Sequence, residues 1–194
     1  MKEKTQLLAL IAGKNRGLLS NESDQVAIFQ AIEKLEGFNP TPNPLEAKNL
    51  LEGDWRLLYT TSRGLLGLDR FPFLRLGQIY QSIRTEESKI YNIAEIEGIP
   101  FFEAIVSVCA SFVQISENKV KVNFERSIIC LQKLIDYRSP SQFIKLIEDQ
   151  KHFTWLDFPI NNREQKGWLE ITYLDADMRI GRGNEGNLFV LVKD

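Results

Sequence analysis

Residues 53–61, "GDWRLLYTT", mark the point at which the pattern of the sequence changes. Before them, apolar residues recur at helical spacing; from Asp54 onward they alternate with polar residues, which is the period of a half-buried strand. Seven further strand-like runs follow, over residues 77–84, 89–96, 104–115, 119–130, 168–174, 178–182 and 188–193. The chain from residue 53 onward is therefore predicted to be mainly β.

Most of these runs are joined by short turns, which predicts an antiparallel meander. The alternation is cleanest after a hairpin turn at Glu117 and Asn118, where Val120, Val122 and Phe124 share one face. About eight such strands are expected to close into a barrel, because closure removes exposed strand edges. A barrel of that size has room inside for side chains or for one small ligand.

The first third of the chain has a helical pattern. Residues 4–12 predict a short helix, and a second helix is expected from an N-cap at Asn21, supported by Asp24, to Gly37. The proline-rich residues 39–44 predict an extended connector, and Asn43 with Pro44 predicts a third helix that ends at Leu51. We expect one domain over residues 1–194, with a helical segment (1–52) packing on or near a barrel (53–194).

Composition excludes several classes of function. The 194 residues are 43% hydrophobic and 26% charged with a net charge of −2, so no basic face indicates nucleic-acid binding. No apolar run approaches the roughly 18 residues of a membrane span. The N-terminus begins like a signal peptide, but its apolar core is short and "GKNR" (13–16) follows it. A mature, non-secreted protein is therefore expected.

Residues that can carry catalysis or bind a metal are not arranged in a known motif. Cys109 and Cys130 are far apart and predict buried, inert thiols, although a single disulfide between them remains open. Asp175 and Asp177 do not have the spacing of a calcium loop and predict a hairpin turn. His152 has no partner nucleophile marked by a motif. We therefore predict no enzymatic activity, no metal and no cofactor.

The tripeptide Gly53-Asp54-Trp55 resembles the Gly-x-Trp signature of lipocalin-like barrels, in which an arginine from the end of the barrel packs over the Trp ring. Two arginines are available, Arg179 and Arg182. They are three residues apart on one strand, so they point to opposite faces and only one points inward. A guanidinium over an indole contributes about 0.5–2 kcal/mol. We predict that Arg179 packs on Trp55.

Four segments in order carry a more specific resemblance: "LLEGDWRLLYTTS" (50–62), "GQIYQSI" (77–83), "NIAEI" (92–96) and "GWLEITYLDADMRIGRGNEGNLFVLVK" (167–193). Together they resemble the plastid-lipid-associated protein (PAP/fibrillin) family. The resemblance implies a lipocalin-like protein at the thylakoid membrane or lipid globules (plastoglobules), linked to carotenoid and quinone physiology and photoprotection. It implies a cyanobacterial-type member, peripheral to the thylakoid on the cytoplasmic side, or a plastid stromal or thylakoid protein if the chain is processed.

The expected function is non-enzymatic binding of a hydrophobic small molecule: a fatty acyl lipid, a prenylquinone or a carotenoid. The residues predicted to line the cavity are Leu57, Tyr59, Ile79, Val106, Val108, Val122, Phe124, Ile171 and Tyr173. Those predicted at the mouth are Leu66, Phe71 and Phe73, in an apolar insertion that either plugs the barrel, gates a ligand or touches a membrane. The alternative is an accessory protein with a filled barrel that supports a prenylquinone-biosynthesis enzyme or a photosynthetic complex.

Overall fold

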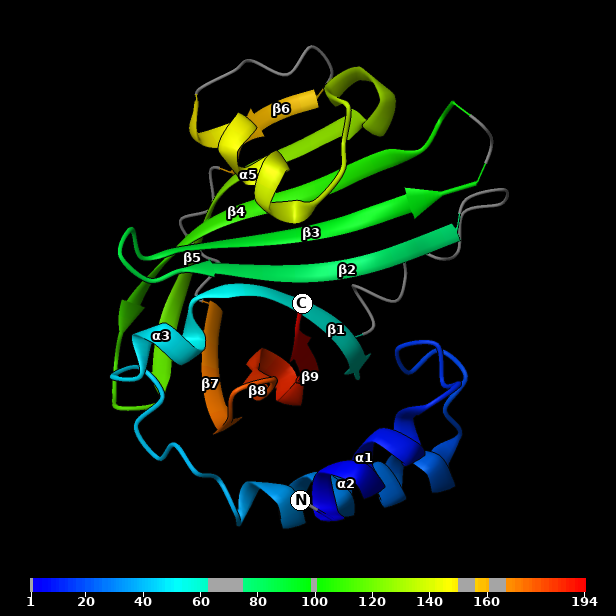
Figure 1. Ribbon diagram of the computed structural model, residues 1–194, viewed down its shortest axis with the longest axis vertical. Coiled ribbons are helices and arrows are strands. Elements are labelled where there is room, and N and C mark those ends of the chain that lie inside the picture. Colours follow the sequence, from blue (N-terminus) through cyan, green and yellow to red (C-terminus); the bar gives the residue numbers. More distant parts are fainter. Residues whose placement is uncertain (1, 63–74, 99–100, 150–155, 161–166) are drawn as a thin grey trace.

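The chain forms a β-barrel with helices packed on its outside (Figure 1). The computed structural model describes residues 2–62, 75–98, 101–149, 156–160 and 167–194. Within these ranges nine strands form one antiparallel sheet in the order β4-β3-β2-β1-β9-β8-β7-β5-β6. A further pairing of β4 with β5 closes eight of them into a barrel and leaves β6 outside. The prediction of a mainly β fold with a barrel of about eight strands is confirmed.

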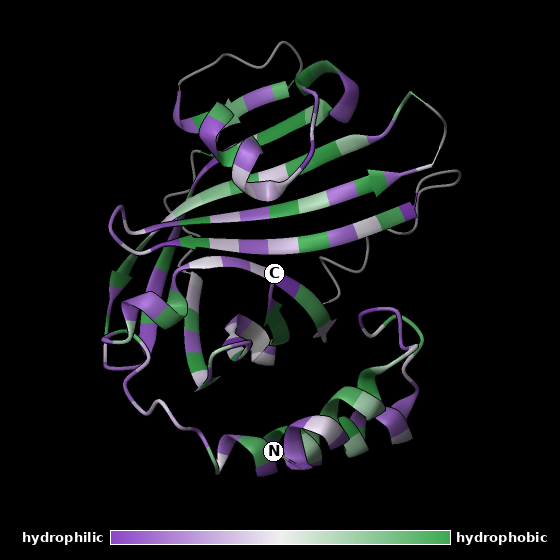
Figure 2. Ribbon diagram, in the orientation of Figure 1, coloured by the Kyte–Doolittle hydropathy of each residue, from purple (hydrophilic) through white to green (hydrophobic). Residues whose placement is uncertain are grey.

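The strands fall close to the predicted runs. Their bounds are β1 Gly53–Thr60, β2 Arg75–Arg84, β3 Lys89–Glu97, β4 Ala104–Gln114, β5 Lys119–Leu131, β6 Leu156–Pro159, β7 Gly167–Leu174, β8 Met178–Gly183 and β9 Leu188–Lys193. The alternation that predicted them is visible as bands of hydrophilic and hydrophobic residues along β2 and β3 in Figure 2. Because successive side chains point to opposite faces, each long strand supplies residues to the interior and to the outer surface.

The short strand β6 was not predicted. It pairs with the C-terminal half of β5, from Arg126 opposite Pro159 to Ile129 opposite Leu156. The N-terminal half of β5, residues 119–122, pairs instead with β7. The strand β5 therefore changes partner along its length, and only its first half continues the closed wall of the barrel toward β7.

The helices are α1 Lys2–Ile11, α2 Glu22–Glu36, α3 Lys48–Leu51 and α5 Pro140–Glu148, with 3-10 turns over Gln132–Ile135 and Asn184–Gly186. The predicted start of α2 is confirmed: the Asn21 side chain accepts from Asp24 N at 2.8 Å, and the Asp24 side chain accepts from Asn21 N at 3.1 Å. Ser139 caps α5 in the same manner, accepting from Gln142 N at 3.2 Å. Such caps satisfy backbone donors that the first helical turn leaves unpaired.

The helix predicted from Asn43 and Pro44 begins later, and α3 covers only Lys48–Leu51. Residues 43–46 make a turn, closed by a bond from Glu46 N to Asn43 O. Leu45 N donates to Glu117 O in the β4–β5 turn at 3.4 Å, and the Leu45 side chain packs against the interior clusters of the barrel. This tertiary packing outweighs the local preference for a helix that starts at Pro44.

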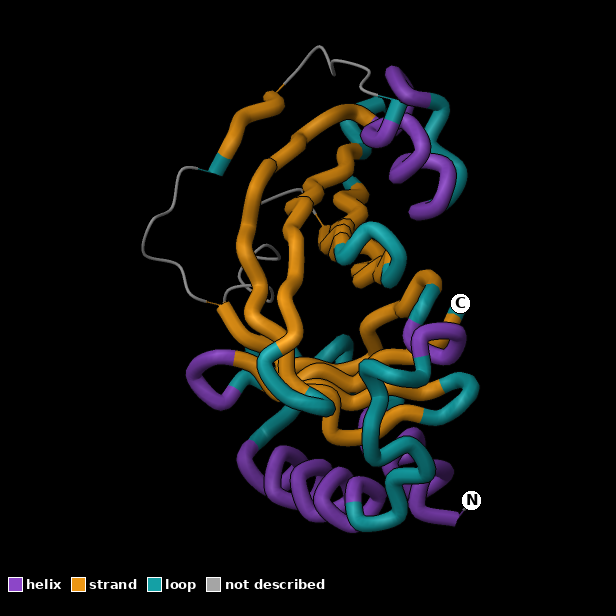
Figure 3. Tube along the Cα trace, turned by 90° about the vertical axis from the view of Figure 1, so that its left-hand side faces the viewer, coloured by secondary structure: helices purple, strands orange, loops and turns teal. Residues whose placement is uncertain are grey.

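Helices α1 and α2 lie side by side against one outer face of the barrel (Figures 1 and 3). Their apolar stripes, which include Leu7, Ile28 and Ile32, form a buried cluster with residues of β1, β7, β8 and β9. Helix α5 covers a different outer face, where Phe143, Ile144 and Ile147 pack on β2, β3, β4 and β5. Burying a side chain of this size contributes about 1.5–3 kcal/mol, so both helices are held mainly by packing.

Candidate functional site

The interior of the barrel is lined by apolar side chains from β1 to β5, β7 and β9. One buried cluster contains Trp55, Leu57, Ile79, Ile83, Ile171 and Leu191, with Val106, Phe112 and Phe189 packed against it. A second cluster, formed by Ile90, Ala110, Val120, Val122 and Leu169, shares Phe112 and Phe189 with the first. The interior is therefore one continuous apolar region.

Most of the predicted lining residues face this interior. Leu57, Ile79 and Ile171 are buried in the first cluster and Val106 packs against it. Val122 is buried in the second cluster and Phe124 packs against it. Val108 is half-buried and is in register with Asn92 on one side and Ser127 on the other. Their contact with a ligand stays a prediction, and Leu66, Phe71, Phe73 and His152 lie outside the described residues.

Tyr59 and Tyr173 do not line the interior. Both are buried in the outer cluster with helices α1 and α2. Each follows an irregularity: β1 shifts register between Leu57 and Tyr59, and β7 between Ile171 and Tyr173. At such a bulge two residues of one strand oppose one residue of its neighbour. The alternation is thereby broken, and the next side chain turns to the other face.

One end of the barrel is closed where Arg179 meets Trp55; we call Leu51, Trp55, Arg179 and Lys193 the barrel floor. The Arg179 Cζ atom lies 5.1 Å from the centroid of the Trp55 ring. Trp55 Nε1 donates to Leu51 O at 2.9 Å, which ties the indole to α3. Lys193 Nζ lies 5.3 Å from the same ring and donates to Leu50 O at 2.8 Å. The contact predicted between Trp55 and Arg179 is present.

Arg182, on the same strand, points outward as predicted. Its Nε and Nη2 atoms donate to the two carboxylate oxygens of Glu36 on α2, at 3.0 and 2.8 Å. The hydrogen bonds to Glu36 raise the pKa of Arg182 above its ordinary value. Arg182 therefore fastens α2 to the barrel, and only Arg179 enters the interior.

Arg179 is fully buried, with 0% of its surface exposed. Its Nη2 atom donates to Gln81 Oε1 at 2.7 Å, and Gln81 Nε2 donates in turn to Asn92 Oδ1 at 2.9 Å. Within the described part of the chain, no carboxylate forms an ion pair with Arg179, and its Nε and Nη1 atoms have no hydrogen-bond partner. Burial lowers the pKa of Arg179 to about 9. Arg179 therefore has no compensating negative charge among the residues that the structure describes.

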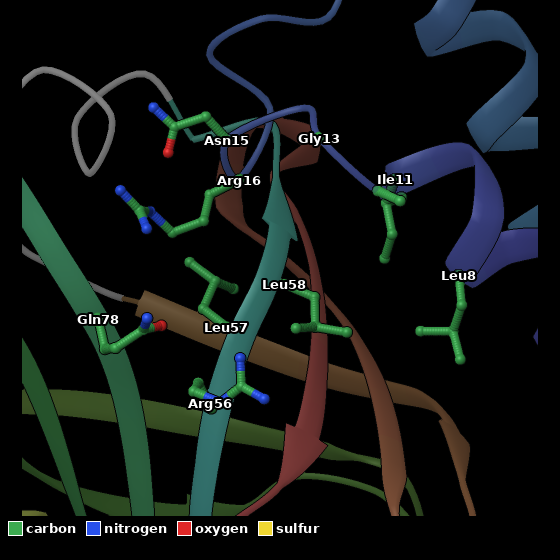
Figure 4. A pocket seen from close by; sticks show the side chains of 10 residues that line it. Leu8, Ile11, Gly13, Asn15, Arg16, Arg56, Leu57, Leu58 and Gln78 are labelled. Atoms are coloured by element: carbon green, nitrogen blue, oxygen red, sulfur yellow. The ribbon is translucent and has the colours of Figure 1, made fainter.

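The wall of the barrel is split between β1 and β2. These strands pair only from Gly53 opposite Ile83 to Arg56 opposite Tyr80. Beyond that point β1 continues beside β9, and β2 beside β3. A cleft of about 320 Å³ lies at the split; its lining residues are Leu8, Ile11, Ala12, Gly13, Asn15, Arg16, Arg56, Leu57, Leu58 and Gln78 (Figure 4). Because Leu57 also belongs to the interior cluster, this β1–β2 cleft adjoins the barrel interior.

Residues 15–17 bridge the split. Arg16 forms a parallel bridge with Tyr59 on β1, its carbonyl accepts from Thr60 N at 3.0 Å, and its Nη2 donates to Leu76 O on β2 at 2.7 Å. Figure 4 shows this side chain extending from its loop toward β2. Asn15 and Arg16 have φ angles of 42° and 57°, an unfavourable left-handed conformation. A strained loop thus spans the cleft, a feature that no sequence motif indicates.

Asp175 forms a hairpin turn between β7 and β8. Asp175 Oδ1 accepts from Asp177 N and Met178 N, at 3.0 and 2.7 Å, as predicted for a hairpin turn, and Lys4 Nζ donates to Asp175. No cluster of metal-ligating side chains occurs in the part of the chain that the structure describes. Cys109 and Cys130 are buried free thiols, and burial raises the pKa of each to about 11. Among the described residues, no helix is long and apolar enough to cross a bilayer.

The fold and the interior define a small antiparallel β-barrel with an apolar core, the class that includes carriers of single small ligands. The family model PAP_fibrillin matches residues 1–192, and the chain belongs to this PAP/fibrillin family. The resemblance seen in the sequence is therefore confirmed. No solved structure matches the chain significantly.

The chain is similar to plant proteins whose names refer to plastids. It is 32% identical to a light-induced chloroplastic protein of Solanum demissum, over 98% of this chain and 67% of the relative. It is 31% identical to a chromoplast-specific carotenoid-associated protein of Cucumis sativus, over 100% and 68% of the two chains. It is 30% identical to a chloroplastic plastid-lipid-associated protein of Citrus unshiu, over 98% and 67%. These relatives support a lipid-associated role, and none of the three names states an enzymatic activity.

Proposed function

We propose that this protein binds a hydrophobic small molecule inside the barrel and does so without catalysis. The observation that carries the proposal is the β1–β2 cleft, which adjoins the apolar interior at Leu57. Its volume of about 320 Å³ is at the lower end of the range for ligand pockets, about 300–1,000 Å³. The ligand classes are those expected from the family resemblance: a fatty acyl lipid, a prenylquinone or a carotenoid.

The mechanism is physical transfer. A ligand enters through the cleft and moves from water into the apolar interior. Each methylene group that is buried in this way contributes about 0.8 kcal/mol to the free energy of binding. The ordering of the ligand and of the cleft loop offsets part of this gain. The expected dissociation constant is therefore about micromolar, which corresponds to about 8 kcal/mol.

A lipid assembly is the proposed source of the ligand. Phe101 and Phe102, between β3 and β4, are 66% and 60% exposed. The pairings of Arg75 with Glu97 and of Ile96 with Ala104 place them at the end of the barrel where β1 and β2 have separated. Exposed aromatic side chains at that end suit a shallow contact with a thylakoid or globule surface.

The experiment measures entry through the cleft. Gln78 is exposed on β2 and lines the cleft, so Gln78→Trp should narrow it without disturbing the core. The probe is retinol, a neutral fluorescent polyene, mixed with the full chain by stopped flow. We expect Gln78→Trp to slow association at least fivefold. The matched control is Gln114→Trp, because Gln114 is also an exposed glutamine on a strand and does not line the cleft.

Three results are informative. Slower entry in Gln78→Trp alone supports the cleft as the route. Equal rates in both variants would reject the cleft but keep binding. Failure of the wild-type chain to bind retinol, fatty acids or a prenylquinone would reject the function. It would favour the accessory protein with a filled barrel, an alternative that is supported by the complete burial of Trp55 at the floor.

A further inference from the structure

Arg179 is a buried cation that forms no ion pair with a carboxylate among the described residues. Buried charges are normally paired, because removing an ion from water costs several kcal/mol. Arg179 has one hydrogen bond, to the neutral Gln81, and one aromatic contact, to Trp55. Neither supplies a negative charge, and the Nε and Nη1 donors are both buried without a partner within the described ranges.

The surroundings of Arg179 add positive charge. Lys193 Nζ lies 5.3 Å from the centroid of the same Trp55 ring. Its burial and the proximity of Arg179 lower the pKa of Lys193, while Glu52 acts in the opposite sense. The Glu52 carboxylate is already used, since it accepts from Thr85 N and Thr85 Oγ1 at 2.6 and 2.8 Å. Among the described residues, the floor therefore has hydrogen-bond donors without a partner and a surplus of positive charge next to an apolar interior.

The floor is within reach of the cleft. Leu57, which lines the cleft, is in register with Leu191, and Leu191 is in register with Arg179. Two strand spacings separate Leu57 from Arg179, which is about 10 Å between their backbones. Leu191, which lies between the two positions, belongs to the same interior cluster as Leu57.

We propose that Arg179 binds the carboxylate of a long-chain monocarboxylic acid, whose hydrocarbon chain runs along the interior toward the β1–β2 cleft. This proposal rests on the proposed function and names the ligand class. One carboxylate matches one buried guanidinium in charge, whereas a doubly charged phosphate monoester leaves an excess negative charge in an apolar region. Charge-assisted hydrogen bonds of this type are about twice as strong as neutral ones.

The experiment compares two ligands that differ only in charge. Dodecanoic acid and methyl dodecanoate are titrated calorimetrically, below their aggregation limits, into the full chain at pH 7. We expect the acid to bind the wild-type chain at least tenfold more tightly than the ester. Arg179→Met, which keeps the length and apolar character of the stem, should lower the affinity for the acid at least tenfold and change that for the ester less than twofold. Arg182→Met is the matched control and should alter neither.

A second variant keeps the test decisive if Arg179→Met does not fold. Gln81→Glu places a carboxylate where Gln81 Oε1 now accepts from Arg179, so it competes with the ligand. It should abolish the preference for the acid. Equal affinities for acid and ester in the wild-type chain would overturn the proposal while leaving hydrophobic binding intact. Binding of neither ligand would instead overturn the proposed function and with it this inference.

Discussion

Replacing Gly17 by alanine is expected to weaken the bridge that residues 15–17 make across the β1–β2 split. Gly17 has a φ of +110°, and a Cβ atom there would lie 2.4 Å from Thr60 O. A left-handed conformation costs an alanine about 1–2 kcal/mol. Relieving the clash requires Thr60 to move and weakens its bond to Arg16 O, which adds about 1–2 kcal/mol. The free energy of unfolding should therefore fall by about 2–4 kcal/mol.

Gly13→Ala is the matched control, because Gly13 also has a positive φ, +72°, but has no atom within 4 Å of the added Cβ. It should cost only the conformational part, about 1–2 kcal/mol. Urea unfolding gives both free energies, and calorimetry should show a Tm about 4–16 °C lower for Gly17→Ala, from about 2–4 °C per kcal/mol in a chain of this size. Retinol should also enter Gly17→Ala faster. If the two variants have equal stability, the close packing of Gly17 on β1 is wrong.

Two further predictions concern groups outside the barrel interior. Burial opposes ionisation of Asp175, but hydrogen bonds from Lys4, Tyr173 and the backbone hold the pKa of Asp175 well below its usual range. Its ionised form therefore contributes stability at pH values above about 4, which is lost as the pH falls toward the folded-state pKa. Asp175→Asn should lower the free energy of unfolding by about 1–2 kcal/mol at pH 7 and by progressively less below pH 4. Asp136→Asn, at the exposed ion pair with Arg138, is the control and should hardly change the free energy of unfolding at pH 7, because exposed ion pairs contribute little; an effect equal to that of Asp175→Asn would contradict the assignment. Burial raises the pKa of Cys109 and of Cys130 to about 11, so both remain protonated thiols at pH 8. A thiol reagent at pH 8 should therefore modify neither cysteine in the native protein and both in urea. Rapid labelling of the native protein would show that these thiols are not buried.

The sequence was most informative where short-range rules decide the structure. The alternation over residues 119–130 predicted β5, and Asn21 with Asp24 predicted the capping box of α2. The separation of Arg179 and Arg182 by three residues on one strand predicted that the two side chains point to opposite faces, as they do. In each case neighbours in sequence determine the geometry, so the pattern alone was sufficient.

The sequence was least informative where long-range contacts override a local pattern. Strict alternation predicted Tyr59 and Tyr173 inside the barrel, but bulges that depend on the partner strands turn both outward. The strand β6 is four residues long and contains Pro159, so it has too little pattern to be recognised. The helix α3 is shorter than predicted because Leu45 packs on the barrel. The residues from Asn43 to Leu51 carry no sign of this contact with distant strands.

Part of the candidate site was also beyond sequence reasoning. The β1–β2 cleft exists because the two strands separate after Arg56, and a loop far away in sequence, at Asn15 and Arg16, crosses the gap. Arg179 lacks a carboxylate partner among the described residues because of how the closed barrel arranges side chains that are far apart in sequence. That arrangement cannot be read from the sequence. Sequence predicted the aromatic contact of Arg179 but not its surplus donors.

The most direct test of ligand binding in the barrel uses the fluorescence of Trp55. In a chain with Trp155 and Trp168 replaced by phenylalanine, bromine on a bound ligand quenches the remaining indole only at close range. We predict strong quenching by 2-bromododecanoic acid, whose bromine is next to the carboxylate, and weaker quenching by 12-bromododecanoic acid at matched occupancy. Occupancy without quenching by either acid would place the ligand outside the barrel and contradict the central claim.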